Sequence, residues 1–188
     1  MKLEDILLEG HIEAYDYILS NIDKLYKEEN AFHPVFALFL KSKTDDPTPA
    51  FTFLNLPDDF VPMLNSQEGK NILDKFFKYQ IDSIIETDDE FEPYGFLMIT
   101  EVWKTKLPED VDMEEFMKLS DEERYDLAQE RGVKTESIYI VLNTKEGDMT
   151  ADYDVIRDGD AFVRSEEPQI TFFEKGKGDL NMNKFKYF

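Results

Sequence analysis

Hydrophobic side chains recur at helical spacing in two long stretches of the chain. The first stretch, residues 3–29, carries Leu7, His11, Ala14, Ile18, Ile22 and Leu25, and the second carries Ile72, Leu73, Phe76, Phe77, Ile81, Ile84 and Ile85. Residues three or four positions apart lie on one face of an α-helix, so these stripes predict two long amphipathic helices. The second helix is expected to begin at a capping box of Asn65 and Glu68 and to end near Thr87.

The remaining apolar segments have the length and composition of β-strands. The expected strands are residues 34–43, 50–56, 94–106, 136–145, 149–157, 161–164 and 170–174. Segment 34–43 is apolar on both faces, which is typical of a strand at the centre of a sheet, and segment 94–106 is the clearest strand of the chain. The tight turn around Gly147 predicts a hairpin between its flanking strands.

The order of these elements predicts an α+β fold. We expect a mainly antiparallel sheet of about five to seven strands, with the two long helices packed on one face. Residues 107–133 interrupt the run of strands and contain two capping-box spacings, Asp112 with Glu115 and Ser120 with Glu123. This segment is therefore predicted to be a small helical insertion.

The charge of the chain is strongly negative and unevenly distributed. Of 188 residues, 42 are Asp or Glu and 21 are Lys or Arg, which gives a net charge of −21. Residues 81–131 contain 17 acidic and 5 basic side chains, whereas residues 175–188 contain four lysines and one aspartate. Hydrophobic residues make up 41% of the chain, enough for a core. We expect residues 1–174 to form a single domain and 175–188 a basic, aromatic tail.

Several kinds of chemistry are excluded or disfavoured. The chain has no cysteine, and it has neither a P-loop nor a GxGxxG motif. Its beginning does not resemble a signal peptide, and no apolar run approaches the ~18 residues that a membrane span needs. We therefore expect a cytoplasmic protein with no cofactor and no membrane contact. Direct binding to nucleic acid is not expected, since this chain would repel a polyanion.

Carboxylates are the main candidates for catalytic or metal-binding groups. Glu101 lies between Ile99 and Trp103 on one face of a predicted strand, where apolar surroundings would raise its pKa and permit general acid or base catalysis. The alternative for Glu101 is a structural ion pair. A second group consists of Asp152, Asp154, Asp158 and Asp160. Its spacing does not match a calcium loop, so no metal site is assigned to it.

Two functions remain compatible with the sequence. In the first, the protein is a non-catalytic interaction or regulatory module whose partner is another protein with a basic surface. The residues expected to bind that partner are Glu114, Glu115, Asp121 and Glu122. One version is a phage-type inhibitor that mimics nucleic acid, although acidic surfaces also serve solubility alone.

The alternative function is a carboxylate-based enzyme of the hydrolase type, with or without a divalent metal. It would use Glu101 together with the group from Asp152 to Asp160. These side chains would then have to converge in one cleft. Between the two functions, the sequence favours the module without catalysis.

Overall fold

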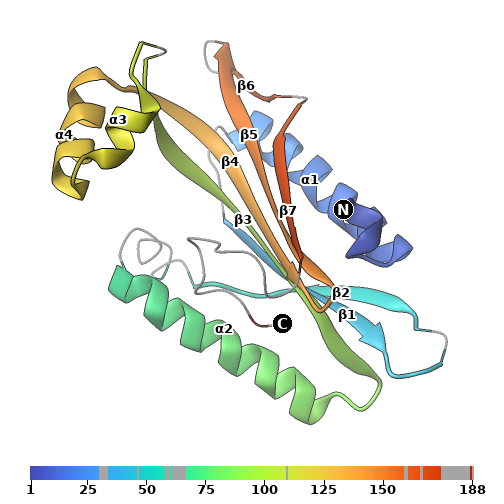
Figure 1. Cartoon of the computed structure of the whole chain (residues 1–188). Helices are drawn as coiled ribbons and strands as arrows, with labels where there is room; N and C mark the ends of the chain where they lie inside the picture. Colours follow the sequence, from blue (N-terminus) through green and yellow to red (C-terminus); the bar gives the residue numbers. More distant parts are fainter. Residues whose placement is uncertain are drawn as a thin grey trace.

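A computed structural model describes residues 1–29, 34–45, 47–57, 60, 67–108, 110–158, 161–165, 167–174 and 187. The chain forms an antiparallel sheet with helices packed against it (Figure 1). The helices are a short 3-10 turn at Leu3–Asp5, α1 at Glu9–Glu29, α2 at Gln67–Thr87, α3 at Met113–Lys118 and α4 at Asp121–Arg131. The strands are β1 at Val35–Ser42, β2 at Pro49–Phe53, β3 at Phe91–Lys106, β4 at Val133–Thr144, β5 at Gly147–Asp158, β6 at Ala161–Arg164 and β7 at Gln169–Glu174. The predicted α+β class, the antiparallel sheet and the helical insertion are confirmed.

The long strand β3 lies near the middle of the sheet. The strand order is β2-β1-β3-β4-β5-β6, and β7 also pairs with β5. β7 pairs with residues 147–152 of β5 and β6 with residues 155–158, so the two short strands share one edge of β5. β3 pairs with β1 through its first part and with β4 from Gly95 to its end. The predicted position of β1 inside the sheet is confirmed, because β1 pairs with β2 on one side and β3 on the other.

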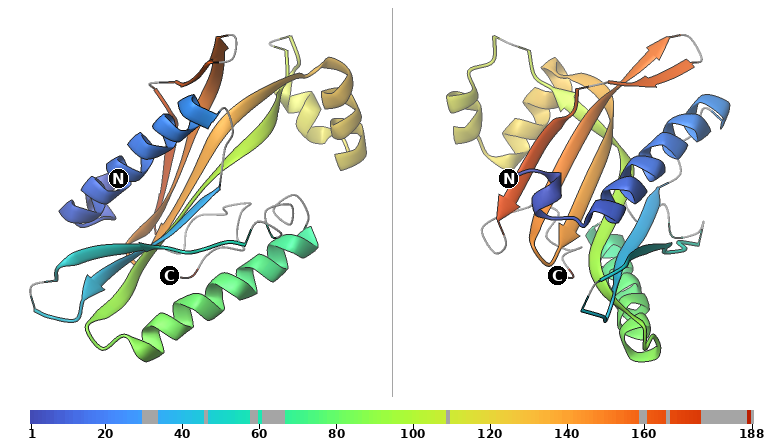
Figure 2. Two further views of the ribbon diagram at one scale, coloured as in Figure 1. Left: turned by 180° about the vertical axis from the view of Figure 1, so that it is seen from behind. Right: turned by 90° about the vertical axis from the view of Figure 1, so that its right-hand side faces the viewer.

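The two long helices cover opposite faces of the sheet (Figure 2). On the α1 side the sheet contributes Ala37, Phe39, Leu97, Ile99, Ile138, Ile140 and Leu142, and on the α2 side Phe36, Leu38, Leu40, Phe96, Met98 and Val141. The prediction that both helices share one face is wrong. Successive side chains of a strand point to opposite faces, so strands that are apolar on both sides need cover on both sides.

Helix α1 begins at Glu9 rather than near residue 3, because the 3-10 turn Leu3–Asp5 precedes it. Gly10 lies in its first turn, where the helix passes close to β2. A Cβ atom on Gly10 would lie 2.4 Å from Cγ of Pro49, closer than non-bonded carbon atoms approach. The glycine is therefore required by this close approach. The capping box expected at Asn65 falls outside the described residues.

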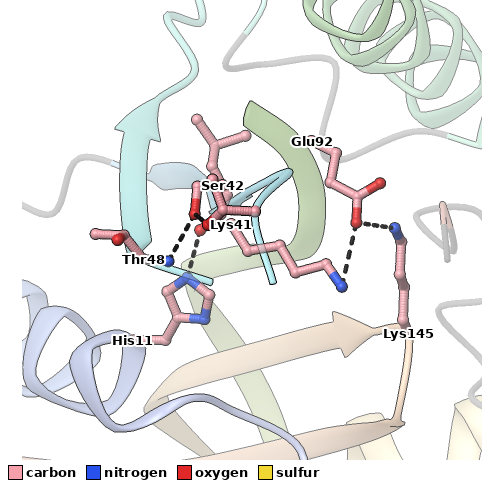
Figure 3. Close-up of polar contacts among 8 residues, drawn as sticks. His11, Lys41, Ser42, Thr48, Glu92 and Lys145 are labelled. Atoms are coloured by element: carbon pink, nitrogen blue, oxygen red, sulfur yellow. Dashed lines mark hydrogen bonds and ion pairs between the residues drawn. The ribbon is translucent and has the colours of Figure 1, made fainter. Parts of the chain in front are cut away.

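His11 is buried in the α1 core, and its ring nitrogen Nε2 lies 2.7 Å from the carbonyl oxygen of Leu40 (Figure 3). The burial of His11 agrees with its position on the apolar stripe of the first predicted helix. Nearby on the surface, Glu92 pairs with Lys41 at 3.1 Å and with Lys145 at 3.5 Å. The hydrogen bond from Lys41 is the main reason that the pKa of Glu92 is lowered. Because these groups are partly exposed, the pairs contribute little to stability.

Candidate interaction surface: the helical arm

The segment between β3 and β4, residues 107–132, forms a helical hairpin that we call the arm. It projects from one end of β3 and β4, well away from the β1–β2 hairpin (Figure 1). No residue of α3 is buried, and no other described side chain between residues 110 and 132 is buried either. Arg131 at the end of α4 pairs with Asp110 at 2.6 Å and so joins the two ends of the arm. The arm therefore has no fully buried side chain among those described, although α4 contacts β3 and Phe116, Leu119 and Leu127 are half-buried.

Helix α4 begins with the predicted capping box. The Ser120 hydroxyl accepts a hydrogen bond from the amide of Glu123 at 3.3 Å, and the Glu123 carboxylate accepts one from the amide of Ser120 at 2.9 Å. The Ser120 hydroxyl and amide also keep the pKa of Glu123 below its ordinary value. The Ser120 hydroxyl and the Glu123 carboxylate thus accept hydrogen bonds from backbone amides at the start of α4, which would otherwise bind water. This box sets where α4 begins.

Helix α3 is capped by Asp112. Its carboxylate accepts hydrogen bonds from the amides of Glu114 at 2.8 Å and Glu115 at 3.3 Å. The predicted partner in this capping box, Glu115, instead accepts a hydrogen bond from Lys118 at 2.6 Å. The cap at Asp112 is thus confirmed, whereas the Glu115 side chain accepts its hydrogen bond from Lys118 further along the helix.

Replacing Ser120 with alanine is expected to unwind part of α4. Loss of an N-cap costs about 1 kcal/mol, which shifts a local helix–coil equilibrium roughly fivefold toward coil. Since the described arm side chains are not buried, the urea midpoint of the domain should stay unchanged. Cα chemical shifts of residues 121–131 measure the helix content, with Gln129→Ala as the control at an exposed position of the same helix. Unchanged helical shifts in Ser120→Ala would contradict the capping role.

The four predicted partner-binding residues lie in the first turns of the two arm helices. Glu114 and Glu115 are exposed at the start of α3, and Glu122 is exposed at the start of α4. Asp121 is the first residue of α4, but its side chain is outside the described part of the structure. Acidic side chains also stabilise helix N-termini through the helix dipole. Their position therefore has one structural cause that is independent of any partner.

Two exposed methionines accompany these acids. Met113 and Met117 of α3 are 56% and 62% exposed and lie one turn apart. The guanidinium of Arg124 in α4 lies 3.9 Å from the sulfur of Met117. Exposed methionine adapts to irregular partner surfaces. These methionines are not among the residues predicted to bind a partner, although their four-residue spacing places them on one face of a helix.

The carboxylates proposed for catalysis lie on opposite faces of the sheet. Glu101 of β3 is aligned with Ile138 of β4, which is aligned in turn with Tyr153 of β5. Ile138 and Tyr153 both lie in the α1 core, so Glu101 is on that face. Asp152 of β5 is aligned with Tyr139 of β4. Tyr139 packs against the α2 core, so Asp152 is on the opposite face. Glu101 and Asp152 therefore do not converge in a common cleft.

The aspartates of β5 show no metal-binding arrangement in the part of the chain that is described. Asp152 pairs with Lys104 across β4, and Asp154 is exposed. Asp160 and the side chain of Asp158 lie outside the described residues. Among described side chains, no group of three or more His, Asp and Glu residues could hold a metal ion.

Comparisons with known proteins found no match: no family model, no curated protein and no solved structure corresponds to this chain. No helix in the described ranges is both long and apolar enough to cross a membrane. The interpretation of the arm therefore rests on the geometry and charge of the arm itself.

Proposed function

We propose that this protein is a non-catalytic interaction module that binds a basic surface of another protein through the arm. The observation that carries this proposal is the exposure of the arm: a helical hairpin whose described side chains are never buried. Short helices are marginal in water unless they pack against something. A partner that covers the arm would supply that packing.

The composition of the arm indicates the chemistry of the partner. Residues 107–132 contain ten acidic and three basic side chains. Such a concentration of charge speeds association with a basic surface and suppresses association with acidic ones. Met113 and Met117 add exposed apolar area, of the kind found at the centre of interfaces. A partner with cations around an apolar patch fits both features.

A nucleic-acid-binding protein is one class with such a surface, and a phage-type inhibitor of such a protein is the narrower form of the proposal. In that form the arm carboxylates occupy the positions of phosphate groups. Its support is the charge of the arm. The enzyme alternative has no comparable support, because Glu101 and Asp152 face opposite sides of the sheet.

Neutralising the four predicted binding residues is expected to weaken partner binding about tenfold, since each exposed charge contributes a fraction of a kcal/mol to association. The arm variant carries Glu114→Gln, Glu115→Gln, Asp121→Asn and Glu122→Gln. A matched variant with the same net charge carries changes at exposed positions of α1 and α2, namely Glu13→Gln, Asp16→Asn, Asp82→Asn and Glu86→Gln. Proteins captured by the wild type are purified, and their Kd is measured by calorimetry for all three chains.

The proposal requires a partner whose affinity falls in the arm variant, stays within about threefold in the matched variant, and weakens with salt. Equal losses in both variants would mean that net charge alone attracts the protein. Release of the partner by duplex DNA would support the inhibitor form, and retention against excess DNA would contradict that form.

A further inference from the structure

Tyr187, near the end of the chain, is docked on the α2 side of the sheet. Its backbone amide donates a hydrogen bond to Oδ1 of Asn143 at 2.7 Å, and its hydroxyl donates to the backbone carbonyl of Asp74 at 3.4 Å. Its ring stands edge-on to Phe96, with ring centres 4.9 Å apart. Helix α2, β3 and β4 each supply one of these contacts. We call these three contacting residues the tyrosine seat.

The acceptor in the seat is fixed in advance by its own surroundings. Asn143 is fully buried, and its amide nitrogen donates to Oδ1 of Asp148 at 2.5 Å. Asp148 is itself buried, with 2% of its surface exposed. With the nitrogen of Asn143 held by Asp148, its oxygen is directed to the amide of Tyr187. A buried carbonyl oxygen left without a donor would cost about 1–3 kcal/mol.

The seat contacts three groups that any tyrosine in an extended peptide carries. They are a free backbone N–H, an aromatic ring and a hydroxyl donor. Burial raises the pKa of the Tyr187 hydroxyl further above neutral pH, which favours its protonated, donating form. None of the three contacts depends on the covalent link to β7. The seat could therefore hold the same side chain from a separate molecule.

The residues beside Tyr187 in the sequence add charge complementarity. Lys184 and Lys186 precede it, in a chain whose net charge is −21. A separate segment with lysines beside a tyrosine would be attracted in the same way. It would have to compete with the tail, since a tethered ligand acts at an effective concentration on the order of millimolar.

We propose that the tyrosine seat is a peptide-binding site for a tyrosine in a basic, extended segment of the partner protein, and that the chain's own Tyr187 occupies it until the partner displaces it. The proposal rests on the proposed function in taking the partner to be basic and to bind the arm. Binding of the arm would raise the local concentration of that segment enough to exchange it for the tail. The arm and the seat would then act on one partner.

The test uses the full-length chain with Tyr187→Ala and a fluorescent peptide that copies Lys184–Phe188. Saturable binding to this variant is expected at micromolar peptide, and binding to the wild type should be at least tenfold weaker because the tail competes. Two control peptides keep the charge of the first. One replaces its tyrosine with alanine, and the other methylates the amide nitrogen of the tyrosine and so removes the donor to Asn143. Each should bind at least tenfold more weakly.

Three results would each overturn the proposal: no saturable binding to the Tyr187→Ala chain, equal binding of the three peptides, or equal affinity for variant and wild type. The wild type gives a measurement that does not depend on the variant folding. At millimolar peptide, the NMR signal of the Tyr187 amide should shift as the tail is displaced, and an unmoved signal would contradict the proposal. Peptide affinity should be the same in the arm variant and in the matched variant, which have the same net charge, so a failure of the seat is distinguishable from a failure of the arm.

Discussion

Replacing Phe77 with alanine is expected to lower the free energy of unfolding by about 3–5 kcal/mol. Phe77 is fully buried between α2 and the sheet. Its ring centre lies 4.6 Å from that of Phe36 on β1 and 5.5 Å from that of Phe96 on β3. The sheet backbone limits how far these neighbours can move into the space, so a cavity should remain. The lost aromatic contacts add to the cost of the cavity.

Urea denaturation followed by circular dichroism measures this change. Tyr79→Ala is the control, because Tyr79 lies on the same helix and is 73% exposed. Its effect should stay within about 0.5 kcal/mol. A loss below about 1 kcal/mol for Phe77→Ala would mean that the packing of α2 on this face contributes little to the domain.

The identity of most elements could be predicted because periodicity is a local property of the sequence. The helix ending at Thr87 and the strand from Ala161 to Arg164 lie within a residue or two of their predicted bounds. The face that each helix covers is not local. It depends on where the chain crosses the sheet, and a stripe of apolar residues fits either side of a two-faced strand. The unbroken run of apolar residues along β1 carried that information, since both of its faces are buried and needed cover.

The features of the candidate sites likewise differ in whether they depend on neighbouring or on distant residues. The cap at Ser120 and the acidic character of the arm could be predicted, since both depend on neighbouring residues. The opposite orientation of Glu101 and Asp152 follows from strand register, which is set by pairing between distant segments. The contact between Asn143 and Tyr187 joins residues 44 positions apart, and neither residue has a distinctive local pattern. Such a contact becomes visible only in the folded chain.

The buried histidine of α1 makes the stability of the domain depend on pH. The ring of His11 lies 5.1 Å from those of Phe39 and Tyr94. Among described residues, none gives its buried Nδ1 a hydrogen bond of normal geometry. Burial lowers the pKa of His11 from its ordinary value of 6.5, and backbone contacts with Leu40 and Ala50 oppose this. The folded protein therefore holds the imidazole neutral.

The sign of the pH effect follows from that lowered pKa. Below pH 6.5 the histidine of the unfolded chain takes up a proton, whereas the folded chain resists protonation. The unfolded state then binds more protons, and the equilibrium moves toward it. The contribution of His11 is complete above the unfolded pKa and is lost as the pH falls through the folded pKa. The largest slope for one group is about 1.4 kcal/mol per pH unit.

Substitution of His11 by glutamine tests this linkage, because glutamine keeps a donor for the Leu40 carbonyl and does not titrate. The wild type should be the more stable protein at pH 7.5, owing to the packing of the ring between Phe39 and Tyr94. That advantage should shrink by about 1–2 kcal/mol between pH 7.5 and pH 5, as measured by urea denaturation. Taking the difference between the two proteins removes the effect of the many carboxylates, which titrate in both. A difference that stays constant over this range, or grows as the pH falls, would show that the folded state accommodates the charged imidazole.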